Sequence, residues 1–217
     1  MIYVVLLQSC EGSHQARFSD MVQHSAKHLI IGGGIIGCST AYHLAKNGEK
    51  DVVLLEKAML TDGATWHAAG LVGQLRGSRN TTRMLKRSVD MYDQLEAETG
   101  MAFDWKKVGS LRLAATRERL LEAKRLTTMA RSFDLEMHMI SAAEAKALFP
   151  YIDESALHGA AFIPSDGHVD PAGLCQAIAS GARKYGADIR QGVKVLDFEV
   201  TNGRITQVIT SKGTYEA

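Results

Sequence analysis

Hydrophobic and polar positions near the start of the chain predict a strand, a helix and a second strand. Residues 28–31 are apolar after the first position and end directly in the glycine-rich residues 32–37. Residues 39–46 continue with the 3.6-residue period of an amphipathic helix. Residues 51–56 then form another apolar run, which closes in Glu56. Such unbroken runs are typical of buried parallel strands, so the pattern predicts a βαβ unit.

The remaining chain alternates between helical and strand-like segments. Helices are expected over residues 80–99, 116–133, a short segment that the capping box Ser141-Ala-Ala-Glu144 opens, and Pro171 to about residue 185. Strands are expected over residues 108–114, 157–164 and 187–190, and as a hairpin of residues 193–201 and 204–210 closed by Asn202-Gly203. This mixture predicts an α/β fold, in which a dinucleotide-binding βαβ domain is interleaved with an α+β domain.

We expect three parts of the chain from these elements. Residues 1–26 have no sustained period and precede the first strand, so we expect a mobile extension there. Residues 27–100 and 165–217 carry the expected dinucleotide-binding domain. Residues 101–164 carry part of a second domain, which contacts the substrate.

Composition and charge exclude several other classes of protein. The chain has 217 residues, 46% of them apolar, and can bury a sizeable core. A net charge of +1 without a basic cluster gives no reason to expect a nucleic acid or an acidic membrane surface as a partner. The longest apolar stretch, residues 1–7, is too short to span a membrane and lacks the basic start of a signal peptide. Three widely spaced cysteines indicate neither a disulfide framework nor a zinc site, so we expect no metal and a cytoplasmic location.

The glycine spacing has a chemical interpretation. In the sequence Gly-x-Gly-x-x-Gly, Gly32 allows a tight turn, Gly34 lets the backbone approach a pyrophosphate, and Gly37 lets the helix pack closely on the strand. The phosphates then lie at the helix N-terminus, where unpaired N–H groups favour an anion. Glu56 ends the second strand about 20 residues later, where an acceptor for ribose hydroxyls is expected.

Residues 57–73 are mostly small, apart from Trp66 and His67. Small residues with several glycines suggest a backbone that runs against the ligand of the glycine turn. From spacing alone, a hydrogen-bonded structural role is the default interpretation of His67, and a place in the core is the default for Trp66. The basic residues of the following helical segment either face an anionic substrate or form a solvated face: Arg76, Arg79, Arg83, Lys86 and Arg87.

Four motifs together carry a family resemblance. The motifs are residues 32–37, the run Val53-Leu-Leu-Glu56-Lys57, and the stretches Thr65-Trp-His-Ala-Ala-Gly-Leu71 and Asp166-Gly-His-Val-Asp-Pro171. Together they resemble the amine-oxidising flavoproteins of the dimethylglycine dehydrogenase and sarcosine dehydrogenase group. That group belongs to the wider glycine/D-amino-acid oxidase fold. The likeness runs from about Lys27 to the last residue, and Trp-His-Ala-Ala-Gly is its most selective part.

The resemblance implies FAD as the cofactor, with a covalent bond between His67 and the 8α-methyl group of the flavin. It also implies that Ile35 and Ile36 lie along the pyrophosphate, that Glu56 and Lys57 lie at the adenosine ribose, and that the backbone of Val195 lies at the adenine. The segment implied to follow the flavin comprises Gly63, Ala64, Thr65, Trp66, His67, Ala68, Ala69, Gly70 and Leu71.

The implied reaction is oxidation of an N-methylated glycine such as dimethylglycine or sarcosine. A hydride equivalent passes from the carbon next to nitrogen to the flavin, and an electron acceptor then reoxidises the flavin. Members of the group are several times longer, so we expect the chain to be an N-terminal fragment that is incomplete at the C-terminus of its cofactor domain. A folate is expected only in a missing C-terminal region, and no catalytic residue can be assigned.

Two other functions stay open. The first is another amine or amino-acid oxidase of the same fold. The second is a catalytically silent relative, because the regulatory subunit of pyruvate dehydrogenase phosphatase resembles this family yet serves in regulation.

Overall fold

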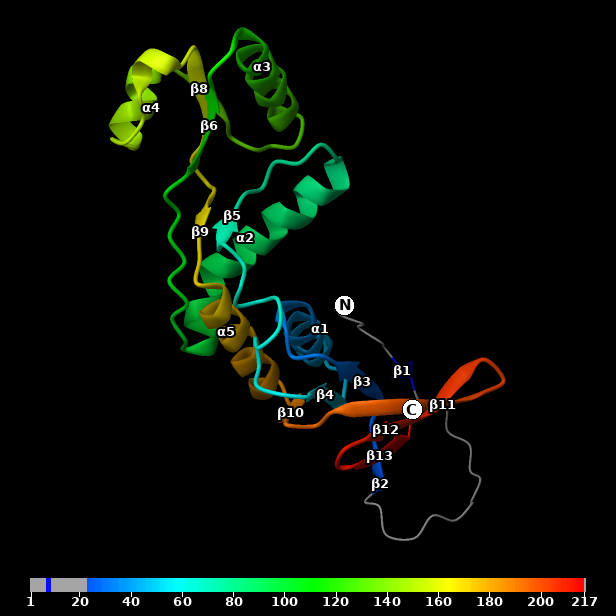
Figure 1. The fold of residues 1–217 in the computed structure, drawn as a ribbon. Helices are drawn as coiled ribbons and strands as arrows, with labels where there is room; N and C mark the ends of the chain where they lie inside the picture. Colours follow the sequence, from blue (N-terminus) through cyan, green and yellow to red (C-terminus); the bar gives the residue numbers. More distant parts are fainter. Residues whose placement is uncertain (1–6, 9–22, 217) are drawn as a thin grey trace. The chain divides into compact units, whose positions relative to one another are not determined.

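The structure is a computed structural model that describes residues 7–8 and 23–216 (Figure 1). The chain divides into two compact units. The glycine-turn unit contains the described residues up to Ala69, together with Leu95–Phe103 and the residues from Pro171 onward. The second unit contains Gly70–Gln94 and Asp104–Asp170. Because each unit is built from separate stretches of the chain, the predicted interleaved α/β architecture is confirmed.

A four-stranded sheet forms the centre of the glycine-turn unit. Its order is β1–β3–β4–β10, with bounds Leu7–Gln8, His28–Ile31, Val52–Glu56 and Asp188–Gln191. Strands β3, β4 and β10 are parallel, and β1 is antiparallel to β3. Helix α1 (Ile35–Lys46) connects β3 to β4, which confirms the predicted βαβ unit.

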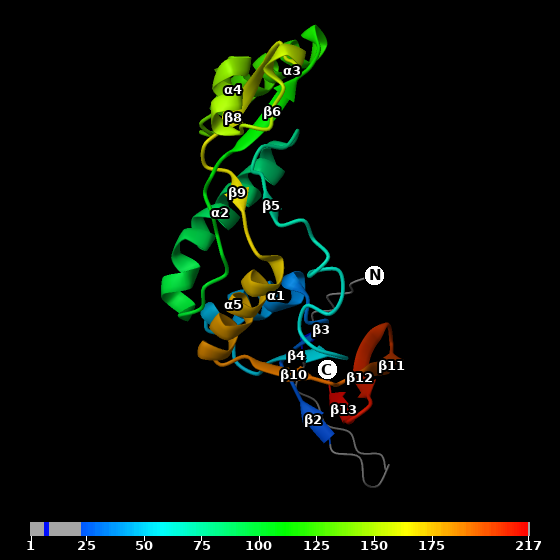
Figure 2. The same cartoon turned by 60° about the vertical axis from the view of Figure 1, so that its left-hand side comes forward.

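Helices α1 and α5 (Pro171–Lys184) lie side by side, as both views show (Figure 1 and Figure 2). Small residues make this close packing possible. A Cβ on Gly181 of α5 would lie 2.8 Å from the ring of Tyr42 on α1. The Tyr42 hydroxyl donates to Oε1 of Glu98, at 2.6 Å. Lys46 and Tyr185 donate to the same carboxylate, so the last turn of α2 (Arg79–Thr99) is joined to both helices.

A second four-stranded sheet has the order β11–β12–β13–β2, with bounds Val195–Thr201, Arg204–Thr210, Gly213–Glu216 and Gln23–Ser25. The predicted hairpin of β11 and β12 is confirmed, and its turn residues Asn202 and Gly203 have φ of 53° and 75°. Strand β13 pairs antiparallel with β12 and parallel with β2.

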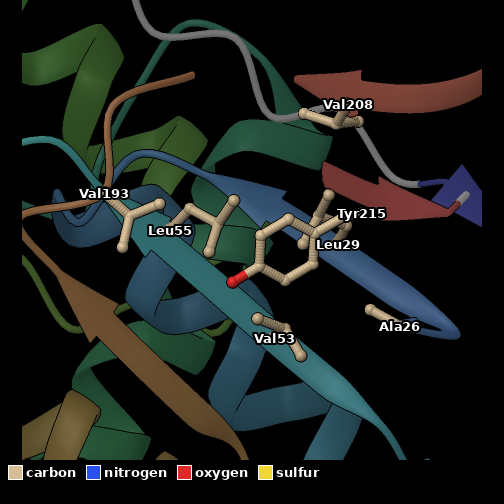
Figure 3. Packing of buried hydrophobic residues seen from close by; sticks show 7 residues of the cluster. All are labelled: Ala26, Leu29, Val53, Leu55, Val193, Val208 and Tyr215. Atoms are coloured by element: carbon tan, nitrogen blue, oxygen red, sulfur yellow. The ribbon is translucent and has the colours of Figure 1, made fainter. Parts of the chain in front are cut away.

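An apolar cluster joins the two sheets of this unit (Figure 3). Leu29 and Leu55 come from the first sheet, and Val208 and Tyr215 come from the second. The ring of Tyr215 points toward the side chains of β4, and Arg190 donates to its hydroxyl at 2.7 Å. The buried cluster therefore fixes the hairpin next to the strand that ends in Glu56.

The second unit contains a three-stranded antiparallel sheet in the order β6–β8–β7, with bounds Ser110–Ala114, Gly159–Ile163 and His138–Ile140. Helices α3 (Arg117–Arg131) and α4 (Ala142–Leu148) pack against it, and a 3-10 helix, η1, covers Glu154–Ala156. The predicted capping box is confirmed, since Ser141 and Glu144 exchange both hydrogen bonds. A two-stranded pair, β5 (Leu71–Val72) and β9 (Gly167–His168), completes the unit.

The predicted helices and longer strands agree with the structure to within a few residues, whereas several short strands were not predicted. The mobile extension expected over residues 1–26 lies mostly outside the described residues. Its described part differs from that expectation, because residues 7–8 and 23–25 pair in sheets and Ala26 is buried in the core.

Candidate functional site

The glycine turn has the backbone geometry that its sequence predicts. Gly32 has φ of +107°, a left-handed conformation that favours glycine, and its N–H donates to the carbonyl of Leu55 at 2.8 Å. A Cβ on Gly37 would lie 1.9 Å from the carbonyl oxygen of Gly32, so only glycine fits there. Gly34 precedes α1 with extended backbone and no side-chain cap. Ile36 and Gly37 belong to the first helical turn, whose N–H groups have no intrahelical acceptor.

Glu56 lies next to this turn and is bonded to it. Its Oε2 accepts a hydrogen bond from the N–H of Gly33 at 2.6 Å, and its Oε1 accepts from the N–H of Ala58 at 2.8 Å. The neighbouring Lys57 is exposed. Each carboxylate oxygen has a second lone pair, so two further donors can still be accepted.

Val195 begins β11 two residues after Val193, which contacts the end of β4. The N–H of Val193 donates to the carbonyl of Glu56 at 2.9 Å, and Val195 is partly buried against the cluster that joins the sheets. The structure therefore brings the glycine turn, Glu56 and the start of β11 together within one unit.

The small-residue segment is tied to the glycine turn at two points. The N–H of Thr61 donates to the carbonyl of Gly33 at 3.0 Å, and the buried Thr65 hydroxyl oxygen accepts from the N–H of Ile35 at 3.0 Å. Thr65 therefore caps α1 from a distance in the sequence. Gly63, Ala64, Ala68 and Ala69 are exposed along the same segment.

Trp66 and His67 lie next to each other on the surface of the glycine-turn unit. Their ring centroids are 4.3 Å apart, and Trp66 is 58% exposed. The interpretation of Trp66 as a core residue is therefore wrong, because the backbone that buries Thr65 turns the next side chain outward. Within the described residues the ring of His67 forms no hydrogen bond, which gives no support to a structural role.

Gly70 and Leu71 belong to the second unit. Leu71 is 81% exposed and pairs with His168 in the short sheet of β5 and β9. The buried carboxylate of Asp166 accepts from the backbone N–H and the side-chain amide of Gln74, both at 3.0 Å, and from the hydroxyl of Ser110 at 2.6 Å. Asp166 thus fixes the chain at Gln74, just after β5.

Part of the basic stretch has a structural role. Guanidinium nitrogens of Arg76 and Arg112 both donate to the carbonyl of Leu75, and Lys86 donates to the carbonyls of Phe133 and Asp134. Arg79, Arg83 and Arg87 are exposed, as the solvated-face alternative requires.

Sequence reasoning missed the structural roles of three side chains in this region. Thr65 caps α1, and Asp166 is the partner of Gln74. The Oε1 atom of Gln191 accepts a hydrogen bond from the N–H of Leu60 at 2.7 Å. All three bonds join residues that are far apart in the sequence, so no local pattern reveals them.

Among the described residues, no three His, Cys, Asp or Glu side chains are placed to hold a metal ion. Across the same residues no helix combines the length and apolar character needed to cross a bilayer.

Comparison with known proteins agrees with this geometry. The sequence model described as FAD dependent oxidoreductase matches residues 27–217. Mitochondrial sarcosine dehydrogenase of Homo sapiens is 38% identical over 88% of this chain, and mitochondrial dimethylglycine dehydrogenase of Rattus norvegicus is 40% identical over 88% of it. The mitochondrial regulatory subunit of pyruvate dehydrogenase phosphatase from Mus musculus is 37% identical, again over 88%.

The chain spans 22% of the length of each of these three relatives. Among solved structures, L-proline dehydrogenase from P. horikoshii superimposes with a TM-score of 0.81 at 31% identity, and the match covers 89% of this chain and 50% of that one.

Proposed function

This chain belongs to the FAD-dependent oxidoreductase family, and on that premise we propose that it is part of an enzyme that oxidises the C–N bond of an N-methylated glycine such as dimethylglycine or sarcosine. The observation that carries the proposal is the glycine turn locked to Glu56 beside the exposed pair Trp66 and His67. FAD, when bound, accepts the hydride equivalent. The protein's part is to hold the cofactor and to orient the amine substrate.

The geometry supports the proposed contacts of the glycine turn and of Glu56, whereas those of Val195 and of residues 63–71 rest on the family resemblance. The first turn of α1 offers the N–H groups of Ile36 and Gly37 and the positive end of a helix dipole to the pyrophosphate, while the N–H of Ile35 beside them is bonded to Thr65. The remaining lone pairs of Glu56, with Lys57 beside it, suit the ribose hydroxyls. The backbone of Val195 is proposed to contact the adenine, and residues 63–71 to follow the flavin. We also propose that residues 27–100 and 165–217 serve the cofactor and residues 101–164 serve the substrate.

We propose that His67 carries the covalent bond to FAD. Attack on the 8α-position needs a neutral imidazole nitrogen that is free of other partners and held at near-contact distance. The exposed ring of His67 makes no hydrogen bond within the described residues and lies against Trp66, which restricts its orientation. A buried, bonded histidine would not meet these requirements.

Acid precipitation of the complete protein tests this bond. Wild-type protein should keep its yellow flavin after washing, and a peptide containing His67 should be heavier by one FAD. His67→Ala should bind FAD but release it into acid, and should oxidise the amine more slowly. The exposed His158 provides a matched control, since His158→Ala should keep the flavin attached. Complete loss of flavin from the wild-type protein contradicts the covalent bond but not FAD binding.

The substrate is tested separately. Flavin reduction under anaerobic conditions should be fast with dimethylglycine or sarcosine, and slow with proline or glycine. The reverse order would favour another amine or amino-acid oxidase of the same fold. Bound flavin that none of these amines reduces would favour the catalytically silent alternative.

The complete protein is also needed for the other assignments. A reading frame that continues beyond codon 217 into a second substrate half and a folate-binding region supports the enzyme, whereas a stop codon at that point supports a non-catalytic product. The electron acceptor is proposed to be a separate partner. We retain the cytoplasm as the proposed location, although several of the relatives are mitochondrial proteins. Fractionation of cells that express the tagged complete protein decides between the two compartments.

A further inference from the structure

Two cysteines that are far apart in the sequence meet behind the glycine turn. Cys38 lies on α1 and Cys175 lies on α5, and both residues are fully buried as free thiols. Their Sγ atoms lie 3.6 Å and 3.8 Å from the same acceptor, the carbonyl oxygen of Gly33. Helices α1 and α5 lie side by side (Figure 1), and this packing brings both thiols to the same carbonyl.

The surroundings of the pair make its two sulfur atoms chemically different. Both S–H groups lie within bonding distance of the Gly33 carbonyl, and the mutual interaction of the two thiols lowers the pKa of Cys175 while it raises the pKa of Cys38, which burial raises further. Cys38 follows the first turn of α1, and Cys175 lies in the second turn of α5, near the ends of the helices whose dipoles favour a thiolate. Cys175 is thus the better nucleophile and Cys38 the proton donor.

We propose that Cys38 and Cys175 are an oxidisable dithiol, which a peroxide converts into a disulfide that joins α1 to α5 behind the glycine turn. The proposal goes beyond the proposed amine oxidation and does not depend on it.

The reaction balances with hydrogen peroxide as the oxidant. The Cys175 thiolate attacks one peroxide oxygen, the O–O bond breaks, and the leaving hydroxide takes up a proton to become water. Cys38 then attacks the sulfur of the resulting sulfenic acid, the S–O bond breaks, and a second water leaves with the Cys38 proton. The pair gives up two electrons and two protons, and the peroxide is reduced to two waters.

Disulfide formation has a defined structural effect. The two sulfur atoms, which now share the Gly33 carbonyl as acceptor, must approach to about 2.05 Å, and Gly33 loses both S–H donors. Its carbonyl keeps the hydrogen bond from the N–H of Thr61 at 3.0 Å. The turn is therefore retained while the two helices become covalently joined. Because both thiols are fully buried, the peroxide reaches them only when the helix ends open locally.

The experiment uses the 217-residue chain with Cys10→Ser, so that Cys38 and Cys175 are the only thiols. The folded chain is incubated with hydrogen peroxide, unfolded, and treated with N-ethylmaleimide, and its intact mass and peptide map are measured. We expect a mass lower by two hydrogens, no maleimide uptake, and one linked peptide that contains both cysteines. A reductant should restore both reactive thiols.

Cys38→Ser and Cys175→Ser in the same background are the matched controls, and neither should form an internal link. The chain with all three natural cysteines is mapped in parallel, so a folding defect in the variants does not decide the result. Two maleimides per oxidised chain would overturn the proposal. So would oxygen added to either sulfur without the linked peptide.

Discussion

Gly37→Ala separates an argument from helix propensity from an argument from packing. Alanine is favoured over glycine within a helix by about 1 kcal/mol, and the change also reduces the entropy of the unfolded chain. Considered alone, the sequence of α1 therefore predicts that Gly37→Ala stabilises the protein. The structure predicts the opposite sign.

The magnitude follows from the contact of the added methyl group. It would lie 1.9 Å from the carbonyl oxygen of Gly32, which is backbone and cannot rotate away as a side chain can. Forced overpacking costs about 1–3 kcal/mol. The contact is shorter than an ordinary van der Waals contact by more than roughly 1 Å, and the strand and helix must separate by that amount, so the cost belongs at the upper end of this range. After about 1 kcal/mol of propensity is subtracted, we expect net destabilisation of about 2 kcal/mol.

Urea unfolding followed by circular dichroism measures the difference between Gly37→Ala and wild type. Gly77→Ala is the control, because a Cβ there meets nothing within 4 Å and the backbone needs no positive φ. This control should be unchanged or slightly more stable. If Gly37→Ala is as stable as wild type while Gly77→Ala behaves as expected, the close packing of α1 on the glycine turn is refuted.

Three further predictions concern charged side chains of the glycine-turn unit. Burial would raise the pKa of Glu98, but hydrogen bonds from Lys46, Tyr42 and Tyr185 hold it below its ordinary value. Glu98→Gln should therefore lower the free energy of unfolding by about 1–2 kcal/mol. Glu96 is exposed, so the control Glu96→Gln should leave that free energy unchanged. Hydrogen bonds from Lys27 and then His28 lower the pKa of Glu49 from 4.5 to about 2. The stability that this shift contributes is present above pH 4.5 and is lost as pH falls toward 2, so the difference in Tm between wild type and Glu49→Gln should vanish across that range. A difference in Tm that stays constant contradicts the ion pairs. Glu56→Ala should lower the stability of the apoprotein by about 2 kcal/mol, because the N–H of Gly33 loses its acceptor. In the complete protein it should also weaken FAD binding by about 1–3 kcal/mol. Wild-type affinity in a calorimetric titration of the apoprotein with FAD would remove Glu56 from the ribose site.

Local patterns were sufficient for the elements whose signals are local. The glycine turn, the capping box at Ser141 and the Asn202-Gly203 hairpin each depend on residues a few positions apart, and the structure confirms all three elements. The same holds for α2, whose amphipathic period continues through Thr99.

Pairings between distant residues could not be predicted in this way. Strand β13 has four residues and β9 has two, too short to show a period, and their partners are set by the tertiary fold. The wide spacing of the cysteines gave no sign that α1 and α5 bring Cys38 and Cys175 to the same backbone carbonyl. Of the candidate site, the cofactor-binding roles of the glycines and of Glu56 were predicted from the residues, and those of His67 and Val195 from resemblance. All of these roles stay predictions.

The pairing of β2 with β13 has a consequence for the order in which the chain folds during synthesis. His24 is directly opposite Tyr215, so the second sheet closes only after nearly all of the described chain has left the ribosome. The second unit is contained within residues 70–170 and can reach its fold earlier. Residues 23–69 must meanwhile stay unaggregated without the strands that later cover Leu29 and Leu55. Chaperone binding to nascent chains should therefore persist until residues 204–216 emerge, and a ribosome-profiling pull-down can measure that point.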